Sequence, residues 1–225
     1  MAEAGFTVLT VCTGNVNRSA LAASLLTAWS QWYLPANVAA RVRVESAGLG
    51  APVGSPMGAR TLAIAERLGV EGSTHRARQI TEAQVRAADL VLVSSTRQRG
   101  LVLEMVPAAL RSTFTIREAG RIVAGLPRRA PATVEDLRAV VAMMADNRHA
   151  LRVDASDDIV DPQGKDDAAF LEMAHQEVPA LARVAAALFA MPDGEVRAYI
   201  EAVELPDAHG GRAEGVDTAR GRRRA

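Results

Sequence analysis

Cys12 and Arg18 stand six positions apart in Cys12-Thr13-Gly14-Asn15-Val16-Asn17-Arg18-Ser19. A loop of this length can aim consecutive backbone N–H groups at one anion, and the start of the following helix adds positive potential. A thiol beside that anion loses its proton readily and becomes a nucleophile. The spacing therefore predicts a phosphatase that works through a cysteinyl-phosphate intermediate.

Each residue type in this loop suits that chemistry. The planar guanidinium of Arg18 can clamp two phosphate oxygens at once. Gly14 lets the backbone approach a ligand, Asn15 tolerates a left-handed conformation, and the Ser19 hydroxyl can donate to the Cys12 thiolate. The expected phosphate-binding residues are Thr13, Gly14, Asn15, Val16, Asn17, Arg18 and Ser19. The alternative is that Cys12 is only a small buried hydrophobe, but Gly, Asn and Arg are poor residues for the end of a core strand.

The elements around this loop alternate between strands and helices. We predict strands at 6–12, 41–46, 89–94 and 113–116, and helices at 19–33, 57–68 and from Thr81. The alternation indicates an α/β fold, a doubly wound four-stranded parallel sheet with helices on both faces. Ligands of such sheets bind at the carboxyl ends of the strands, which is where Cys12 is placed.

The loop resembles the signature loop of the low-molecular-weight protein-tyrosine phosphatases, bacterial type. The resemblance continues in three further segments, Val44-Glu45-Ser46-Ala47-Gly48, Thr74-His75-Arg76-Ala77-Arg78 and Asp158-Ile159-Val160-Asp161-Pro162. It implies a small doubly wound α/β fold and a two-step reaction through a phosphocysteine. The implied activity is hydrolysis of phosphomonoesters, most directly protein phosphotyrosine.

The same resemblance assigns Asp161 as the general acid that protonates the leaving group. Such an acid speeds departure of an alkoxide or phenoxide, and Pro162 stiffens the loop and keeps Asp161 extended. Asp161 lies in an acidic cluster, which by itself is more typical of a solvated loop with a helix cap. The other acids of the cluster are Asp154, Asp157, Asp158, Asp166 and Asp167, and Asp166 or Asp167 can cap the helix that follows.

Ser46 and His75 are supporting residues by the same resemblance. In the family the matching serine and histidine brace the loop asparagine, so we expect both to form hydrogen bonds near Asn15. The expected supporting residues are thus Asn15, Ser19, Ser46 and His75. The alternative is a strand-end serine and a surface histidine.

The chain departs from the family pattern at the walls of the pocket. Gln163 replaces the aromatic residue that usually follows Asp-Pro, and Ala51 stands near the opposite aromatic wall, so stacking on a phenyl ring is weakened. Thr13 resembles the residue found at this position in the branch of the family that acts on phosphoarginine.

Three alternatives to a tyrosine phosphatase stay open. They are a protein-arginine phosphatase, a thiol-dependent arsenate reductase that needs an external thiol because Cys12 is alone, and a non-catalytic phosphate-binding module.

Composition places the chain in a broad class. Formal charge is zero, with 26 basic and 26 acidic residues, so nothing in the total favours nucleic acid or an anionic membrane. The single cysteine excludes an internal disulfide and fits a reducing compartment. No run approaches the length of a membrane span, and the first residues do not form a signal peptide. We expect a cytoplasmic enzyme with a phosphorylated protein as partner and with no cofactor or metal.

Domain organisation follows from the distribution of periodic segments. We predict a phosphatase domain over residues 1–204, with a helical insertion around 118–152 that contains an amphipathic helix at 133–147. Pro179 is expected to kink or divide the last helical stretch. Residues 205–225 lack periodicity and end in an arginine run, which predicts a disordered tail.

Overall fold

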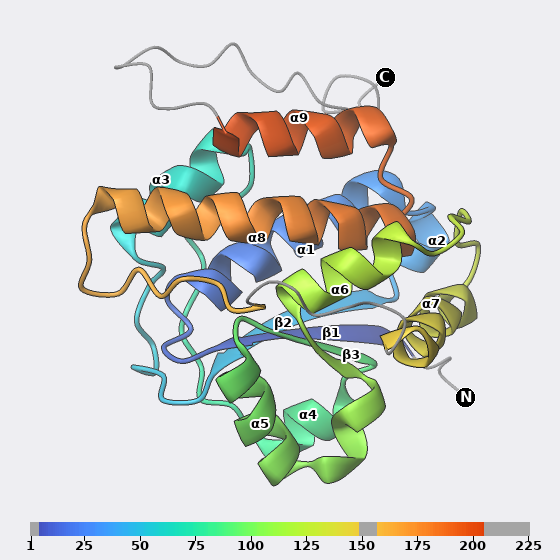
Figure 1. Cartoon of the computed structure of the whole chain (residues 1–225), viewed down its shortest axis with the longest axis horizontal. Helices are drawn as coiled ribbons and strands as arrows, with labels where there is room; N and C mark the ends of the chain where they lie inside the picture. The colour runs from blue at the N-terminus through green and yellow to red at the C-terminus, as the bar shows by residue number, and fades with distance from the viewer. Residues whose placement is uncertain (1–4, 149–156, 205–225) are drawn as a thin grey trace.

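The computed structural model describes residues 5–148 and 157–204 and shows a parallel sheet between two layers of helices (Figure 1). Its strands lie in the order β2-β1-β3-β4, and every neighbouring pair is parallel. The predicted fold class is confirmed. The strands are β1 (Phe6–Cys12), β2 (Val42–Gly48), β3 (Leu90–Val93) and β4 (Thr113–Thr115).

Helices cover both faces of this sheet. Helices α1, α6 and α8 lie over one face, with α9 outside α8, and α4 and α5 lie over the other (Figure 1). The helices are α1 (Arg18–Tyr33), α2 (Ala36–Ala39), α3 (Ala59–Arg67), α4 (Glu82–Ala87), α5 (Thr96–Met105), the 3-10 helix η1 (Pro107–Arg111), α6 (Ile116–Ala124), α7 (Val134–Asp146), α8 (Asp167–Leu188) and α9 (Asp193–Glu204).

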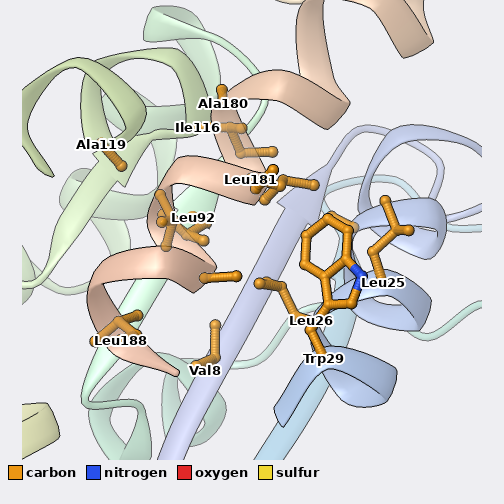
Figure 2. Packing of buried hydrophobic residues seen from close by; sticks show 14 of the residues in the cluster. Val8, Leu25, Leu26, Trp29, Leu92, Ile116, Ala119, Ala180, Leu181 and Leu188 are labelled. Atoms are coloured by element: carbon orange, nitrogen blue, oxygen red, sulfur yellow. The ribbon is translucent and has the colours of Figure 1, made fainter. Parts of the chain in front are cut away.

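Alternation along β1 divides the core between the two faces. Phe6 and Val8 belong to the larger hydrophobic cluster, under α1, α6 and α8, whereas Leu9 and Val11 belong to the smaller one, under α4 and α5. Figure 2 shows part of the larger cluster, to which α1 contributes Trp29, Leu25 and Leu26, β1 Val8, β3 Leu92, and α8 Leu181 and Leu188. Both clusters fix β1 from opposite sides, and β1 is the strand that carries Cys12.

Helices α6 and α8 pack at close range through a glycine. A Cβ atom added to Gly120 of α6 would lie 2.9 Å from the Cα atom of Ala180 in α8, closer than packed atoms tolerate. Any side chain at position 120 would therefore push α8 away from α6. This matters for the site because α8 follows directly on the loop that contains Asp161.

The predicted elements match the structure with differences at their ends. The strand 89–94 is shorter, and the helix expected at 57–68 begins at Ala59. Helix α8 runs unbroken through Pro179, so of the two expected effects, a kink or a division, the division does not occur. Packing of α8 against α1 and α6 outweighs the loss of one helical hydrogen bond.

The segment interpreted as an insertion is packed into the core. Its predicted helix is α7, and the Thr133 side chain accepts a hydrogen bond from Asp136 N in a capping box. Leu137 and Met144 of α7 are fully buried in the larger cluster. The division into a domain over 1–204 with an insertion stays a prediction, and the predicted tail, Asp154 and the end of the insertion lie outside the described residues. None of the helices within 5–148 and 157–204 is both long and apolar enough to cross a bilayer.

Candidate active site

The loop after β1 folds back over its own cysteine. Cys12 is buried, and its Sγ lies 3.2 Å from the backbone nitrogen of Asn15 and 3.0 Å from Ser19 Oγ. The two contacts provide donors for a thiolate, as predicted for Ser19. The loop passes so close to the end of β2 that a Cβ atom on Gly48 would lie 2.6 Å from the carbonyl oxygen of Thr13. Only glycine fits at that position.

Asn15 braces the loop from inside. It is fully buried with φ of 53°, the left-handed conformation that the sequence predicted for it. Its Nδ2 donates to Ser19 Oγ at 2.9 Å, and its Oδ1 accepts from the backbone nitrogen of Arg78 at 2.8 Å. These bonds fix both the loop and the hydroxyl that faces Cys12.

His75 supports the same residue through its main chain. Its Nε2–H donates to the Asn15 carbonyl oxygen at 2.6 Å. Burial lowers the pKa of His75, and the positive charges of Arg78 and Arg76 lower it further. The imidazole is therefore neutral at neutral pH, and its contact with Asn15 agrees with the supporting role suggested for it.

Ser46 does not make the predicted bond. It is buried on β2 in register with Thr10, and none of the hydrogen bonds of Asn15 found in the described part of the chain reaches it. The amide of Asn15 is already held by Ser19 and Arg78. Ser46 is thus a buried residue of β2 without the contact to Asn15 that was expected.

Arg18 is held at the first position of α1 by two contacts of its guanidinium group. It is 4% exposed, and its Nη1 donates to the carbonyl oxygen of Ile159 at 3.3 Å. Its Nη2 forms an ion pair of 2.7 Å with Asp161 Oδ2. Its buried Nε has no hydrogen-bond partner among the described residues. The guanidinium is thus oriented by the protein and retains an N–H for an anion.

The predicted catalytic residues Cys12, Arg18 and Asp161 line one cavity of about 270 Å³. The sequence placed Ala51 near one wall of the pocket, and in the structure its neighbours Gly50 and Pro52 form that wall. None of the aromatic side chains in the described part of the chain lines the cavity. The full lining is Cys12, Thr13, Gly14, Val16, Asn17, Arg18, Gly50, Pro52, Asp161 and Gln163. A thiol, a guanidinium and a carboxyl group therefore face one small space.

Among the acids of the cluster that the structure describes, Asp161 is the one that lines this cavity. Its side chain is half exposed, and its Oδ1 accepts from the backbone nitrogen of Gln163 at 3.2 Å. The other described acids have separate partners: Asp157 pairs with Arg121, Asp158 accepts from Thr96 at the start of α5, Asp166 caps α8, and Asp167 pairs with Arg60. Within the described residues, no group of His, Cys, Asp and Glu is arranged to hold a metal ion.

Gln98 is a site residue that the sequence did not reveal. It is buried in α5, its Oε1 accepts from Ser94 N at 3.0 Å, and its Nε2 donates to Thr13 Oγ1 at 3.2 Å. The bond fixes the exposed Thr13 side chain at the mouth of the cavity. No local pattern around Gln98 indicates this contact, because its partner is 85 positions away.

Glu177 is a second residue that the sequence did not reveal. This side chain of α8 is fully buried, and neither carboxyl oxygen has a hydrogen-bond partner in the described part of the chain. Burial raises the pKa of Glu177 well above its ordinary value, and the positive charge of Arg18 opposes this rise. Glu177 is therefore a buried carboxyl group within electrostatic reach of the arginine of the site.

The raised pKa of Glu177 predicts a pH-dependent loss of stability. Below the ordinary pKa of about 4.5 the carboxyl group is protonated in both states, so stability does not change with pH on its account. Above it, the unfolded chain releases the proton while the folded protein keeps it, so the free energy of unfolding falls by up to about 1.4 kcal/mol per pH unit. The fall ends when the pH passes the folded-state pKa.

Urea unfolding of wild type and Glu177→Gln between pH 4 and 8 measures this effect. We expect the difference in unfolding free energy to shift in favour of Glu177→Gln as the pH rises. Glu172→Gln, which removes an exposed carboxyl group from the same helix, is the matched control and should show no such divergence. A constant difference between wild type and Glu177→Gln across this range would contradict the prediction.

The fold and the loop together define a phosphatase class in which a cysteine and an arginine bracket a phosphate cradle. The sequence model of the low molecular weight phosphotyrosine protein phosphatases matches residues 7–121. The chain belongs to this family, and it is a phosphatase and therefore a hydrolase.

Relatives of the chain include both tyrosine and arginine phosphatases. A probable low molecular weight protein-tyrosine-phosphatase EpsP of Ralstonia nicotianae is 37% identical over 112 residues, which cover 50% of this chain and 71% of that protein. A protein-arginine-phosphatase of Geobacillus stearothermophilus is 32% identical over 113 residues, or 50% of this chain and 70% of that one. The solved structure of the YwlE arginine phosphatase from Geobacillus stearothermophilus superposes with a TM-score of 0.56 at 25% identity, over 80% of this chain and 90% of that one.

Proposed function

We propose that the protein hydrolyses phosphotyrosine in proteins, with Cys12 as nucleophile, Arg18 as phosphate clamp and Asp161 as general acid. The observation that carries the proposal is the single cavity lined by all three side chains. Thr13, Gly14, Asn15, Val16, Asn17 and Ser19 complete the phosphate site through the loop backbone. Family membership supports phosphoproteins as the substrate class.

The proposed reaction has two steps. The Cys12 sulfur attacks phosphorus, the S–P bond forms, and the bond from phosphorus to the substrate oxygen breaks with its electron pair on that oxygen. Asp161 gives its proton to this leaving oxygen. Water then attacks phosphorus and gives a proton to the Asp161 carboxylate, and the S–P bond breaks to return the thiolate and release inorganic phosphate. Arg18 and the loop N–H groups bind the phosphate charge throughout.

Phosphoarginine is the second candidate substrate, because the residue after the nucleophile is a threonine held in place. The bond from Gln98 to Thr13 Oγ1 limits rotation of the β-branched side chain at the cavity mouth. A fixed branch there narrows the entrance and can favour one substrate shape over another. The resemblance to a protein-arginine-phosphatase points the same way.

Kinetics on matched peptides decide between the two substrates. We expect kcat/KM to be higher for a phosphotyrosine peptide than for a phosphoarginine peptide of the same sequence. The preference should be modest, because Gln163 and Pro52 replace stacking walls, and two lost stacked pairs reduce discrimination by about tenfold or more. Thr13→Ile should leave the order of the two substrates unchanged.

The opposite order would overturn the phosphotyrosine assignment. A higher kcat/KM for phosphoarginine in wild type, reversed or blunted in Thr13→Ile, would make Thr13 the selector of an arginine phosphatase. Thr13→Val serves as the matched control, since it keeps the branched shape and removes only the hydroxyl group that Gln98 holds.

A further inference from the structure

Asn17, the residue before Arg18, does not cap the helix that it precedes. Asn17 precedes α1, where its side chain would ordinarily cap the first turn, but it makes no capping bond. The residue is instead 5% exposed, and its Oδ1 accepts from Thr61 Oγ1 of α3 at 2.8 Å. It lies against Gly58, whose added Cβ atom would come within 2.5 Å of Oδ1. The amide is therefore enclosed and oriented.

The other end of this amide reaches the loop that carries the general acid. Asn17 Nδ2 donates to Gln163 Oε1 at 3.1 Å, across 146 positions of sequence. Gln163 in turn donates its backbone N–H to Asp161 Oδ1 at 3.2 Å, and Asp161 Oδ2 pairs with Arg18 at 2.7 Å. Because Arg18 follows Asn17 in the chain, these contacts close a ring that joins the two loops of the site.

One link of this ring depends on charge and the other does not. In the resting enzyme the Arg18–Asp161 ion pair helps to hold the acid loop, residues 157–166. A bound phosphate competes for the guanidinium, and an Asp161 that is ready to donate a proton has no charge to pair with it. The hydrogen bond between the side-chain amides of Asn17 and Gln163 joins two uncharged groups, so it persists under both changes.

We propose that Asn17 and Gln163 form an uncharged clamp that keeps the acid loop on the phosphate loop during catalysis. Both are positioning residues, acting through Asp161. The inference rests on the proposed function, because it requires Asp161 to protonate the leaving group. Arg60 of α3 holds the far side of the same loop, donating to the Lys165 carbonyl oxygen at 2.8 Å and pairing with Asp167 at 2.7 Å. The clamp thus secures the side nearest the leaving group.

The test uses a pair of substrates that differ in their need for an acid. Phenyl phosphate has a poor leaving group and p-nitrophenyl phosphate a good one, so only the first depends strongly on protonation. Gln163→Met keeps the length of the side chain and removes its amide. We expect it to lower kcat/KM for phenyl phosphate about three- to tenfold, the effect of one lost hydrogen bond, and to change p-nitrophenyl phosphate less than about twofold.

Asn17→Ala should also slow phenyl phosphate more than p-nitrophenyl phosphate, on top of any effect on the phosphate loop that both substrates share. The ratio between the two substrates in the double variant should be no larger than in the more affected single variant. In an Asp161→Asn background Gln163→Met should have no further effect, because no acid remains to be positioned. Lys165→Ala, an exposed truncation in the same loop, should match wild type. Affinity for inorganic phosphate should stay within about twofold in Gln163→Met, since the cradle is untouched.

Two results would overturn the clamp. One is an unchanged leaving-group dependence in Gln163→Met, whether both substrates are slowed equally or neither is slowed. The other is an effect of Gln163→Met that persists in the Asp161→Asn background. Failure of the proposed function gives a different result: Asp161→Asn alone would then slow the two substrates equally, instead of slowing phenyl phosphate at least about a hundredfold more.

Discussion

A Cys12→Ser variant is expected to lose turnover of p-nitrophenyl phosphate by at least about a thousandfold. A serine hydroxyl group keeps its proton at neutral pH, and among residues 5–148 and 157–204 no histidine is placed to remove it, since the His75 ring is bound to the Asn15 carbonyl oxygen. The loop N–H groups and Arg18 stay in place. Steady-state kinetics measure the loss of turnover, and calorimetry with inorganic phosphate measures whether the site still binds the anion.

The same variant should still bind inorganic phosphate. Binding depends on the loop backbone and on Arg18, which is oriented by Ile159 and Asp161 and not by the sulfur. Turnover within about tenfold of wild type would remove Cys12 from the role of nucleophile. Loss of both turnover and phosphate binding would mean that Cys12 mainly maintains the shape of the loop.

An Arg18→Lys variant is expected to lose at least about a hundredfold in kcat/KM. The guanidinium meets the Ile159 carbonyl oxygen, Asp161 and a phosphate with donors in one plane, whereas an ammonium group is a compact charge that cannot make two parallel bonds. The phosphate affinity should fall as well. Arg43→Lys, at a side chain that is 74% exposed, is the matched control and should retain wild-type activity.

Near-wild-type turnover in Arg18→Lys would show that charge alone is sufficient and would remove the bidentate clamp from the mechanism. Thermal unfolding of the variant separates a catalytic loss from a structural one. A large fall in melting temperature would indicate that the buried guanidinium, with its bond to Ile159 and its charge acting on Glu177, supports the fold as well.

The sequence predicted the parts of the fold and site that depend on local pattern. An apolar run ended by a glycine- and asparagine-containing loop located β1 and the loop in which Asn15 is left-handed. Thr81 and Thr133 located the starts of two helices, and the structure shows a capping box at each. These signals need only a few neighbouring residues. The loop cysteine, its serine and its arginine could be found for the same reason.

Contacts between distant segments could not be predicted in this way. Gln98 reaches Thr13 and Gln163 reaches Asn17 only because the sheet order brings the ends of β1 and β3 together beside α8. Ser46 was expected to bond Asn15, but the backbone of Arg78 occupies that position. Glu177 resembles any helical glutamate until α8 is packed against α1.

The amide at position 17 has a consequence for oxidation of the enzyme. Cys12 is the single cysteine in the sequence, and the side chain of Asn17 beside it has no thiol. A sulfenic acid formed on Cys12 by peroxide therefore has no second cysteine in the chain with which to form a disulfide. Recovery must come from a small thiol or a partner protein, and without one the sulfur can proceed to the irreversible sulfinic state. The pairing that fixes the acid loop thus leaves the nucleophile dependent on the reducing capacity of its surroundings.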